Sequence, residues 1–199
     1  DVIFVVPKAY GDEDGSSVRL VAAENIDVTH TNMQLEEFWK HIRYLEVSSN
    51  IVPYVDPEEF KKIVESSELE STESPSLSSL KKFKFSGKYG PNLMSEVTRY
   101  ALIAATIASE NQFDVIHVHD WLTFPAGIAA KMVSKKPLVV HVHATEFDRS
   151  GENVNQSVYD IERRGMEVAD KVITVSNYTR NIVITRYGIP ESKVVTVHN

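Results

Sequence analysis

The second half of the chain alternates between short apolar runs and longer segments whose apolar residues recur at helical spacing. The short runs predict strands at Val115–Val118, Leu138–Val142, Lys171–Val175 and Lys193–His198. The longer segments predict helices at Pro91–Glu110, Thr123–Val133, Gln156–Ala169 and Tyr178–Tyr187. Strands and helices therefore follow one another in turn, joined by short links.

The predicted strands are almost continuously apolar, as in VIHV, LVVHV, VITV and VVTV. Such strands are buried on both faces, which is typical of a parallel sheet flanked by helices. We therefore predict a doubly wound, Rossmann-like α/β fold with helices on both faces of the sheet. At 199 residues, a single domain spanning 1–199 is the expectation.

The first half of the chain is less regular. DVIFVVP at the start, Val18–Ala23 and Ile26–His30 read as short strands, and Leu35–Leu45 has helical spacing. From residue 66 onward Ser and Glu dominate, and apolar residues other than leucine are scarce. We expect residues 66–90 to form a mobile loop or insertion.

Composition narrows the class of protein. Hydrophobic residues make up 42% and charged residues 25%, as in ordinary soluble globular chains. The net charge of −7, from 21 basic and 28 acidic residues, argues against a general nucleic-acid or membrane-surface binder. With no cysteine, disulfides, thiolate metal sites and cysteine nucleophiles are all excluded.

The chain shows no apolar run long enough to span a membrane and no leader segment. A cytoplasmic location is expected, because the sequence contains no cysteine that could form a disulfide. It opens directly on one predicted strand and closes on another, without the loose polar residues that usually end a native chain. We therefore expect a fragment of a longer protein, cut at both ends.

Two His-x-His pairs end two of the predicted strands, in DVIHVHDW and in LVVHVHATEF. Ligands of parallel α/β sheets bind outside the carboxyl ends of the strands. His119 and His143 lie at such ends, so we expect them to face a ligand. His117 and His141 lie deeper in their strands, where a neutral imidazole could bond a neighbouring helix or loop.

A metal site is one interpretation of these pairs. Two histidines on one strand face, beside a second pair, could supply the ligands of a metal-dependent hydrolase, with Asp120 or Glu146 as carboxylate ligand or base. Two observations weigh against it. Asp120 points away from His119 unless the strand has already ended, and the helical motif H-E-x-x-H is absent.

Sugar recognition is a second interpretation. A histidine nitrogen can bond a sugar hydroxyl, and Trp121 could offer its ring face to a sugar or pack in the core. Asp120 could bond a hydroxyl, although capping the helix that begins near Thr123 is its simpler role. A non-catalytic carbohydrate-binding α/β module remains an alternative to an enzyme.

Four ordered blocks carry a family resemblance across residues 114–199. DVIHVHDWLTFPAGIAA, PLVVHVHATEFDRSG, ADKVITVSNYTRNIV and KVVTVHN resemble successive blocks of retaining glycosyltransferases with the GT-B fold, above all the glycogen and starch synthase-like members. The first half of the chain resembles the family only loosely. The four blocks are specific together, because they match in order and in spacing.

The resemblance implies two Rossmann-like domains that face each other across a cleft, of which this chain would be the N-terminal, acceptor-side one. A nucleotide-diphosphate sugar would be the donor, held mainly by the absent C-terminal domain without metal or other cofactor. The implied reaction transfers a hexose to an acceptor hydroxyl, with α-glucans among the acceptors and with retention. The isolated fragment would be inactive.

The resemblance also implies roles for individual residues. His119 matches the histidine that contacts the transferred sugar, and His143 matches the histidine that closes the next strand, so both are the expected catalytic residues. Further expected substrate-binding residues lie at the ends of the four predicted strands or in the loop after Leu138–Val142: Asp120, Trp121, Arg149, Gly151, Ser176 and Asn199.

Overall fold

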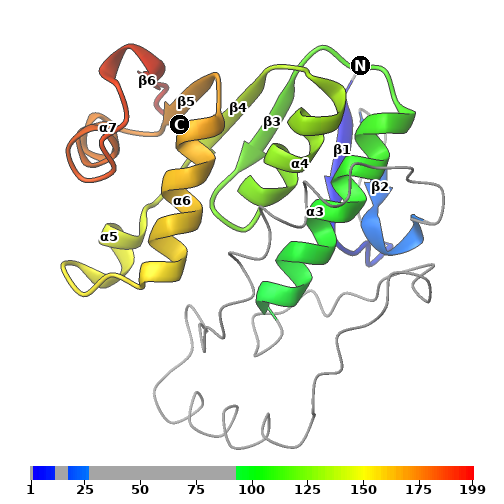
Figure 1. The fold of residues 1–199 in the computed structure, drawn as a ribbon, viewed down its shortest axis with the longest axis horizontal. Coiled ribbons are helices and arrows are strands. Elements are labelled where there is room, and N and C mark those ends of the chain that lie inside the picture. Colours follow the sequence, from blue (N-terminus) through cyan, green and yellow to red (C-terminus); the bar gives the residue numbers. More distant parts are fainter. Residues whose placement is uncertain (1, 12–17, 27–92) are drawn as a thin grey trace, which may run out of the picture. The chain divides into compact units, whose positions relative to one another are not determined.

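The computed structural model describes residues 2–11, 18–26 and 93–199, which form two compact units, Asp1–Ile103 and Ala104–Asn199 (Figure 1). The predicted helix at Leu35–Leu45, the predicted loop at 66–90 and nearly all of the strand predicted at Ile26–His30 lie outside the described residues. Each unit is described by itself.

The first unit contains a pair of parallel strands, β1 (Ile3–Val6) and β2 (Arg19–Ala22), followed by a short 3-10 turn, η1 (Ala23–Asn25). Helix α3 (Leu93–Glu110) begins in this unit. The Tyr100 hydroxyl of α3 donates to the Val5 carbonyl at 2.9 Å, and burial raises the pKa of Tyr100 to about 12. A neutral phenol therefore ties the helix to strand β1.

The second unit is built on a parallel four-stranded sheet in the order β3-β4-β5-β6. Its strands are β3 (Ile116–His119), β4 (Leu138–Val142), β5 (Lys171–Thr174) and β6 (Val194–Thr196). Helices α4 (Phe124–Ser134), α6 (Gln156–Val168) and α7 (Asn177–Thr185) connect them, with the short α5 (Glu146–Ser150) and η3 (Glu191–Lys193) in the links. The prediction of a Rossmann-like parallel α/β fold is confirmed.

The core of the second unit lies between the sheet and its connecting helices. Alternate strand residues such as Leu138, Val140 and Val172 are fully buried against Phe124 of α4 and Met166 of α6. Each strand pairs with the next one in sequence, so right-handed crossovers place α4, α6 and α7 on the same face. The intervening strand residues point to the opposite face.

Helices α4 and α6 approach each other closely at Gly165. A Cβ atom added at Gly165 would lie 2.7 Å from the Cβ of Phe124, well inside van der Waals contact. Gly127 plays the same role between α4 and the sheet, where an added Cβ would lie 2.8 Å from a Leu138 methyl group. Both glycines let a helix backbone approach its neighbour.

Candidate functional site

A tight turn follows β3 and orients the first His-x-His segment. Asp120 adopts a left-handed conformation with φ of 58°, which reverses the direction its side chain would have on a continuing strand. The Thr123 hydroxyl donates to the His119 carbonyl at 2.6 Å, and the Thr123 amide donates to the Asp120 carbonyl at 3.1 Å. Thr123 is the N-cap residue of α4, but its side chain does not cap the helix, because this hydroxyl closes the turn instead.

Asp120 joins the end of β3 to the end of β4. Its Oδ1 accepts a hydrogen bond from the His143 amide at 2.8 Å, and its Oδ2 lies 3.2 Å from His143 Nδ1. The Asp120 amide in turn donates to the His141 carbonyl at 2.9 Å. The expected helix-capping role of Asp120 was therefore wrong: the strand ends at His119, and the turn sends the carboxylate to the neighbouring strand.

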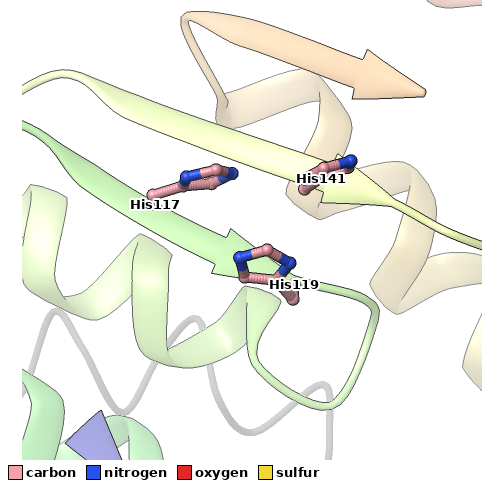
Figure 2. Close-up of side chains that lie close together, drawn as sticks. All are labelled: His117, His119 and His141. Carbon is pink, nitrogen blue, oxygen red and sulfur yellow. The ribbon is translucent and has the colours of Figure 1, made fainter. Parts of the chain in front are cut away.

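The four histidines of the two pairs lie on the face of the sheet opposite α4 and α6, with their rings packed against one another. His119 pairs in register with His141, so the two pairs interleave. Ring centroids are 4.6 Å apart for His117 and His119, 5.1 Å for His119 and His141, and 4.5 Å for His141 and His143. Figure 2 shows His117 and His119 on β3 beside His141 on β4.

This array corrects the expected division into structural and ligand-facing histidines. His117 is exposed, and neither ring nitrogen of His141 has a hydrogen-bond partner among the described residues, although both are shielded from solvent. No described helix or loop group thus bonds His141 as expected. The histidine side chains point to one face of the sheet, whereas the connecting helices cover the other face and cannot reach them.

Three histidines of the array favour the neutral imidazole. Partial burial, followed by repulsion from neighbouring histidines, lowers the pKa of His117, His119 and His141 below its ordinary value. A neutral imidazole keeps a lone pair that accepts a hydrogen bond from a hydroxyl or coordinates a metal ion. These three residues each offer a ring nitrogen, and the three nitrogens lie within 4.8 Å of one another.

A buried charged cluster is formed by Glu146, Arg149, Glu162 and Tyr187. Arg149 Nη2 donates to Glu162 Oε1 at 2.5 Å, and Arg149 Nε donates to Glu146 Oε2 at 3.1 Å. The other oxygen of Glu162 accepts from the Glu146 amide at 3.0 Å and from the Tyr187 hydroxyl. This cluster joins α5 to α6 and to the residues that follow α7.

The cluster also assigns a role to Arg149. Burial alone would lower its pKa, but the carboxylates of Glu162 and Glu146 outweigh that effect and raise the pKa above its ordinary value. The guanidinium is only 15% exposed and is occupied by two carboxylates. Its Nη1 also donates to the Ala144 carbonyl at 3.3 Å, so Arg149 has a structural role in this cluster, and the expected substrate contact stays a prediction.

Sequence reasoning did not find this cluster. The available signal was the position of Glu162 on α6, where it shares the apolar face with Val158, Ile161 and Gly165. Glu162 is only 3% exposed, and a carboxylate that is buried in this way requires a buried partner. Arg149 and Tyr187 are its partners, and they come from α5 and from the residues after α7, so the helix pattern of α6 alone could not reveal them.

The remaining predicted residues follow the carboxyl ends of adjacent strands, as expected, but differ in exposure. Trp121 after β3 is only 4% exposed, so its indole packs in the core and offers no free face to a sugar. Ser176 after β5 caps α7, accepting from the Thr179 amide at 3.0 Å. Gly151 ends α5 with a positive φ, and Asn199 after β6 is exposed. Of the predicted site residues, His119 and His143 belong to the histidine array, and Asp120 contacts it through His143.

Comparison with known proteins identifies the family. The family model described as Glycosyltransferase Family 4 matches residues 72–199, which is more than half of the chain. The chain belongs to glycosyltransferase family 4. All residues of the histidine array and of the buried charged cluster lie within the matched family 4 region.

A relative of this family 4 chain is an uncharacterized glycosyltransferase of Methanocaldococcus jannaschii. The two are 31% identical over 96 residues, which cover 47% of this chain and 25% of the relative. The matched segment therefore spans about a quarter of that relative's length.

Among the described residues, no helix combines the length and apolar character that crossing a membrane requires.

Proposed function

We propose that this chain forms the acceptor-side domain of an enzyme that transfers a hexose from a nucleotide-diphosphate sugar to an acceptor hydroxyl, with retention at the anomeric carbon. An α-glucan of the glycogen or starch type is the proposed acceptor. The observation that carries the proposal is the convergence of His119, Asp120 and His143 at the carboxyl ends of two parallel strands within the family 4 region.

The chemistry of the transfer suits these groups. Positive charge develops on the sugar ring in the transition state, and negative charge develops on the departing diphosphate. Neutral imidazoles and a carboxylate stabilise the first without an unfavourable positive charge nearby. In this proposal His119 accepts a hydrogen bond from a hydroxyl of the transferred sugar, and the partner domain neutralises the diphosphate.

His143 is proposed to act beside His119 as an oriented hydrogen-bonding group. Asp120 Oδ2 lies 3.2 Å from His143 Nδ1, and in this proposal it accepts from an Nδ1–H, so that Nε2 of the ring accepts from a substrate hydroxyl. Asp120 is therefore a positioning residue. Gly151, Ser176 and Asn199 are proposed as further contacts along the same edge of the sheet.

The test uses the full-length protein with a panel of nucleotide-diphosphate hexoses and an α-glucan acceptor. His119→Ala is expected to lower kcat by roughly 100-fold or more, while far-UV circular dichroism and the melting temperature stay close to those of the parent. Arg163→Ala, on the exposed side of α6, is the control and should keep full activity. Wild-type activity in His119→Ala would remove this residue from the site.

Two further measurements separate the parts of the proposal. The anomeric configuration of the first-formed product, read by proton NMR, should match that of the donor, and an inverted product would overturn retention. The isolated 199-residue chain should show no transfer, because the proposed donor-binding groups lie in a partner domain. Turnover by this chain alone would overturn that assignment.

A further inference from the structure

Three imidazole rings from two adjacent strands gather on one face of the sheet. His117 and His119 lie two residues apart on β3, and the register pairs His119 with His141 on β4. Their ring centroids are 4.6 Å, 5.5 Å and 5.1 Å apart, taken pairwise. The close-up shows how the three residues lie on two neighbouring strands (Figure 2).

His141 lacks the partners that a shielded polar side chain normally has. Both of its ring nitrogens are shielded from solvent, and neither forms a hydrogen bond to a described residue. Leaving such atoms unsatisfied costs free energy, so unpaired buried groups in native proteins call for an explanation. A ligand that takes up an imidazole lone pair would provide one.

We propose that His117, His119 and His141 bind one divalent transition-metal ion, of which Zn²⁺ is the best fit. Each residue contributes one ring nitrogen, and these nitrogens already lie within 4.8 Å of one another. In a tetrahedral site with Zn–N bonds of about 2.0–2.1 Å, ligand nitrogens are about 3.3 Å apart. The three side chains must rotate to reach that separation, because the rings of His117 and His141 lie almost parallel, with 10° between their planes.

The ligand set decides the kind of metal. Three imidazoles and no carboxylate favour Zn²⁺, Cu²⁺ or Ni²⁺ over Mg²⁺ and Ca²⁺, which prefer oxygen ligands. Three ligands leave a fourth position for water. Asp120 and His143, which are paired with each other, stand beside the three-histidine cluster and do not belong to the ligand set.

The inference is independent of the proposed sugar transfer, although the two share His119. A metal bound to the His119 nitrogen would withdraw it from a sugar hydroxyl. The site is therefore expected to oppose the proposed transfer, not to supply its chemistry. Binding of the metal alone can be measured in the absence of any sugar, so failure of one proposal leaves the other standing.

The test is titration of the purified, metal-free chain with Zn²⁺ by calorimetry, together with absorption spectra of the Co²⁺ form. One ion per chain is expected, with a tetrahedral Co²⁺ spectrum. His117→Ala and His141→Ala should each weaken Zn²⁺ binding by more than the roughly 10–100-fold that loss of a mere supporting partner costs. His117 is exposed, so its substitution should leave the fold intact, as circular dichroism can verify.

His198→Ala is the matched control. Its ring lies against the Val175 carbonyl, away from the three-histidine cluster, and its removal should leave Zn²⁺ affinity unchanged. A chain that binds no stoichiometric Zn²⁺ would overturn the site. So would a folded His117→Ala variant whose Zn²⁺ affinity equals that of the parent chain.

Discussion

Asp120 holds His143 through both its main chain and its ring. One carboxylate oxygen accepts from the His143 amide at 2.8 Å, and the other lies 3.2 Å from Nδ1. Asp120 directly follows β3 and His143 directly follows β4, so this pair fixes the separation of the two strand ends. It also favours the tautomer of His143 that carries its proton on Nδ1.

Replacing Asp120 with Asn should change that tautomer while preserving the turn. Asparagine tolerates the left-handed backbone, and its carbonyl can still accept from the His143 amide. Its NH₂ group, however, donates to Nδ1 and moves the ring proton to Nε2. Nitrogen NMR of His143 should report this exchange, and kcat of the full-length enzyme should fall by roughly 10–100-fold.

The signals of His198 provide the reference for that experiment, because this residue has no contact with Asp120 in the structure and keeps its own partner at Val175. If His143 showed the same tautomer in Asp120→Asn as in the parent, the result would contradict the positioning role proposed for the Asp120 carboxylate.

Arg149→Ala should destabilise the domain strongly. The substitution leaves Glu162 and Glu146 buried without their cation, and breaking a buried ion pair costs about 3–5 kcal/mol. Arg163→Ala is the matched control, because its pair with Glu167 is exposed and should contribute only about 0–1 kcal/mol. Urea unfolding of both variants measures the difference, and equal losses would contradict the buried role of Arg149.

Tyr187→Phe should cost about 1–3 kcal/mol of unfolding free energy, because it removes a hydroxyl that donates to the buried Glu162 carboxylate. Burial and that carboxylate raise the pKa of Tyr187 above its ordinary value, so the hydroxyl keeps its proton at neutral pH. Tyr178→Phe removes a hydroxyl from a side chain that is 69% exposed, and should change stability by less than about 0.5 kcal/mol. Thermal denaturation compares the two.

Gly165→Ala should destabilise the chain, although alanine is the better helix former by about 1 kcal/mol. The added methyl group would overlap Phe124, and overpacking of this kind costs about 1–3 kcal/mol. Phe124→Leu should relieve part of the overlap, so a double-mutant cycle should show a favourable coupling between the two changes. A stabilised Gly165→Ala variant would mean that α4 and α6 are less tightly packed.

Much of the fold could be predicted from apolar patterning. Strands β3 to β6 are short apolar runs, and α4, α6 and α7 are long enough to show helical spacing, so their predicted bounds lie close to the observed ones. Helix α5 was missed because Glu146–Ser150 is too short to establish a period. Its capping box, formed by Thr145 and Asp148, was the available local signal.

The candidate site was harder to predict, because it depends on register and on one turn. Strand alternation correctly placed each His-x-His pair on one face, but it does not say which residue faces which across two strands. The pairing of His119 with His141 is a tertiary property, as is the carboxylate bridge from Asp120. Alternation continued past His119 would have sent Asp120 to the wrong face.

The pairing of His119 with His141 makes the histidine array a built-in reporter of strand register. A slip of one residue between β3 and β4 would turn every side chain of the slipped strand to the other face, and the stacked imidazoles would separate together. Ring-current shifts in the NMR signals of the histidine protons therefore depend on the register between β3 and β4. During unfolding, these signals would show whether β3 separates from β4 before the helices α4, α6 and α7 unfold.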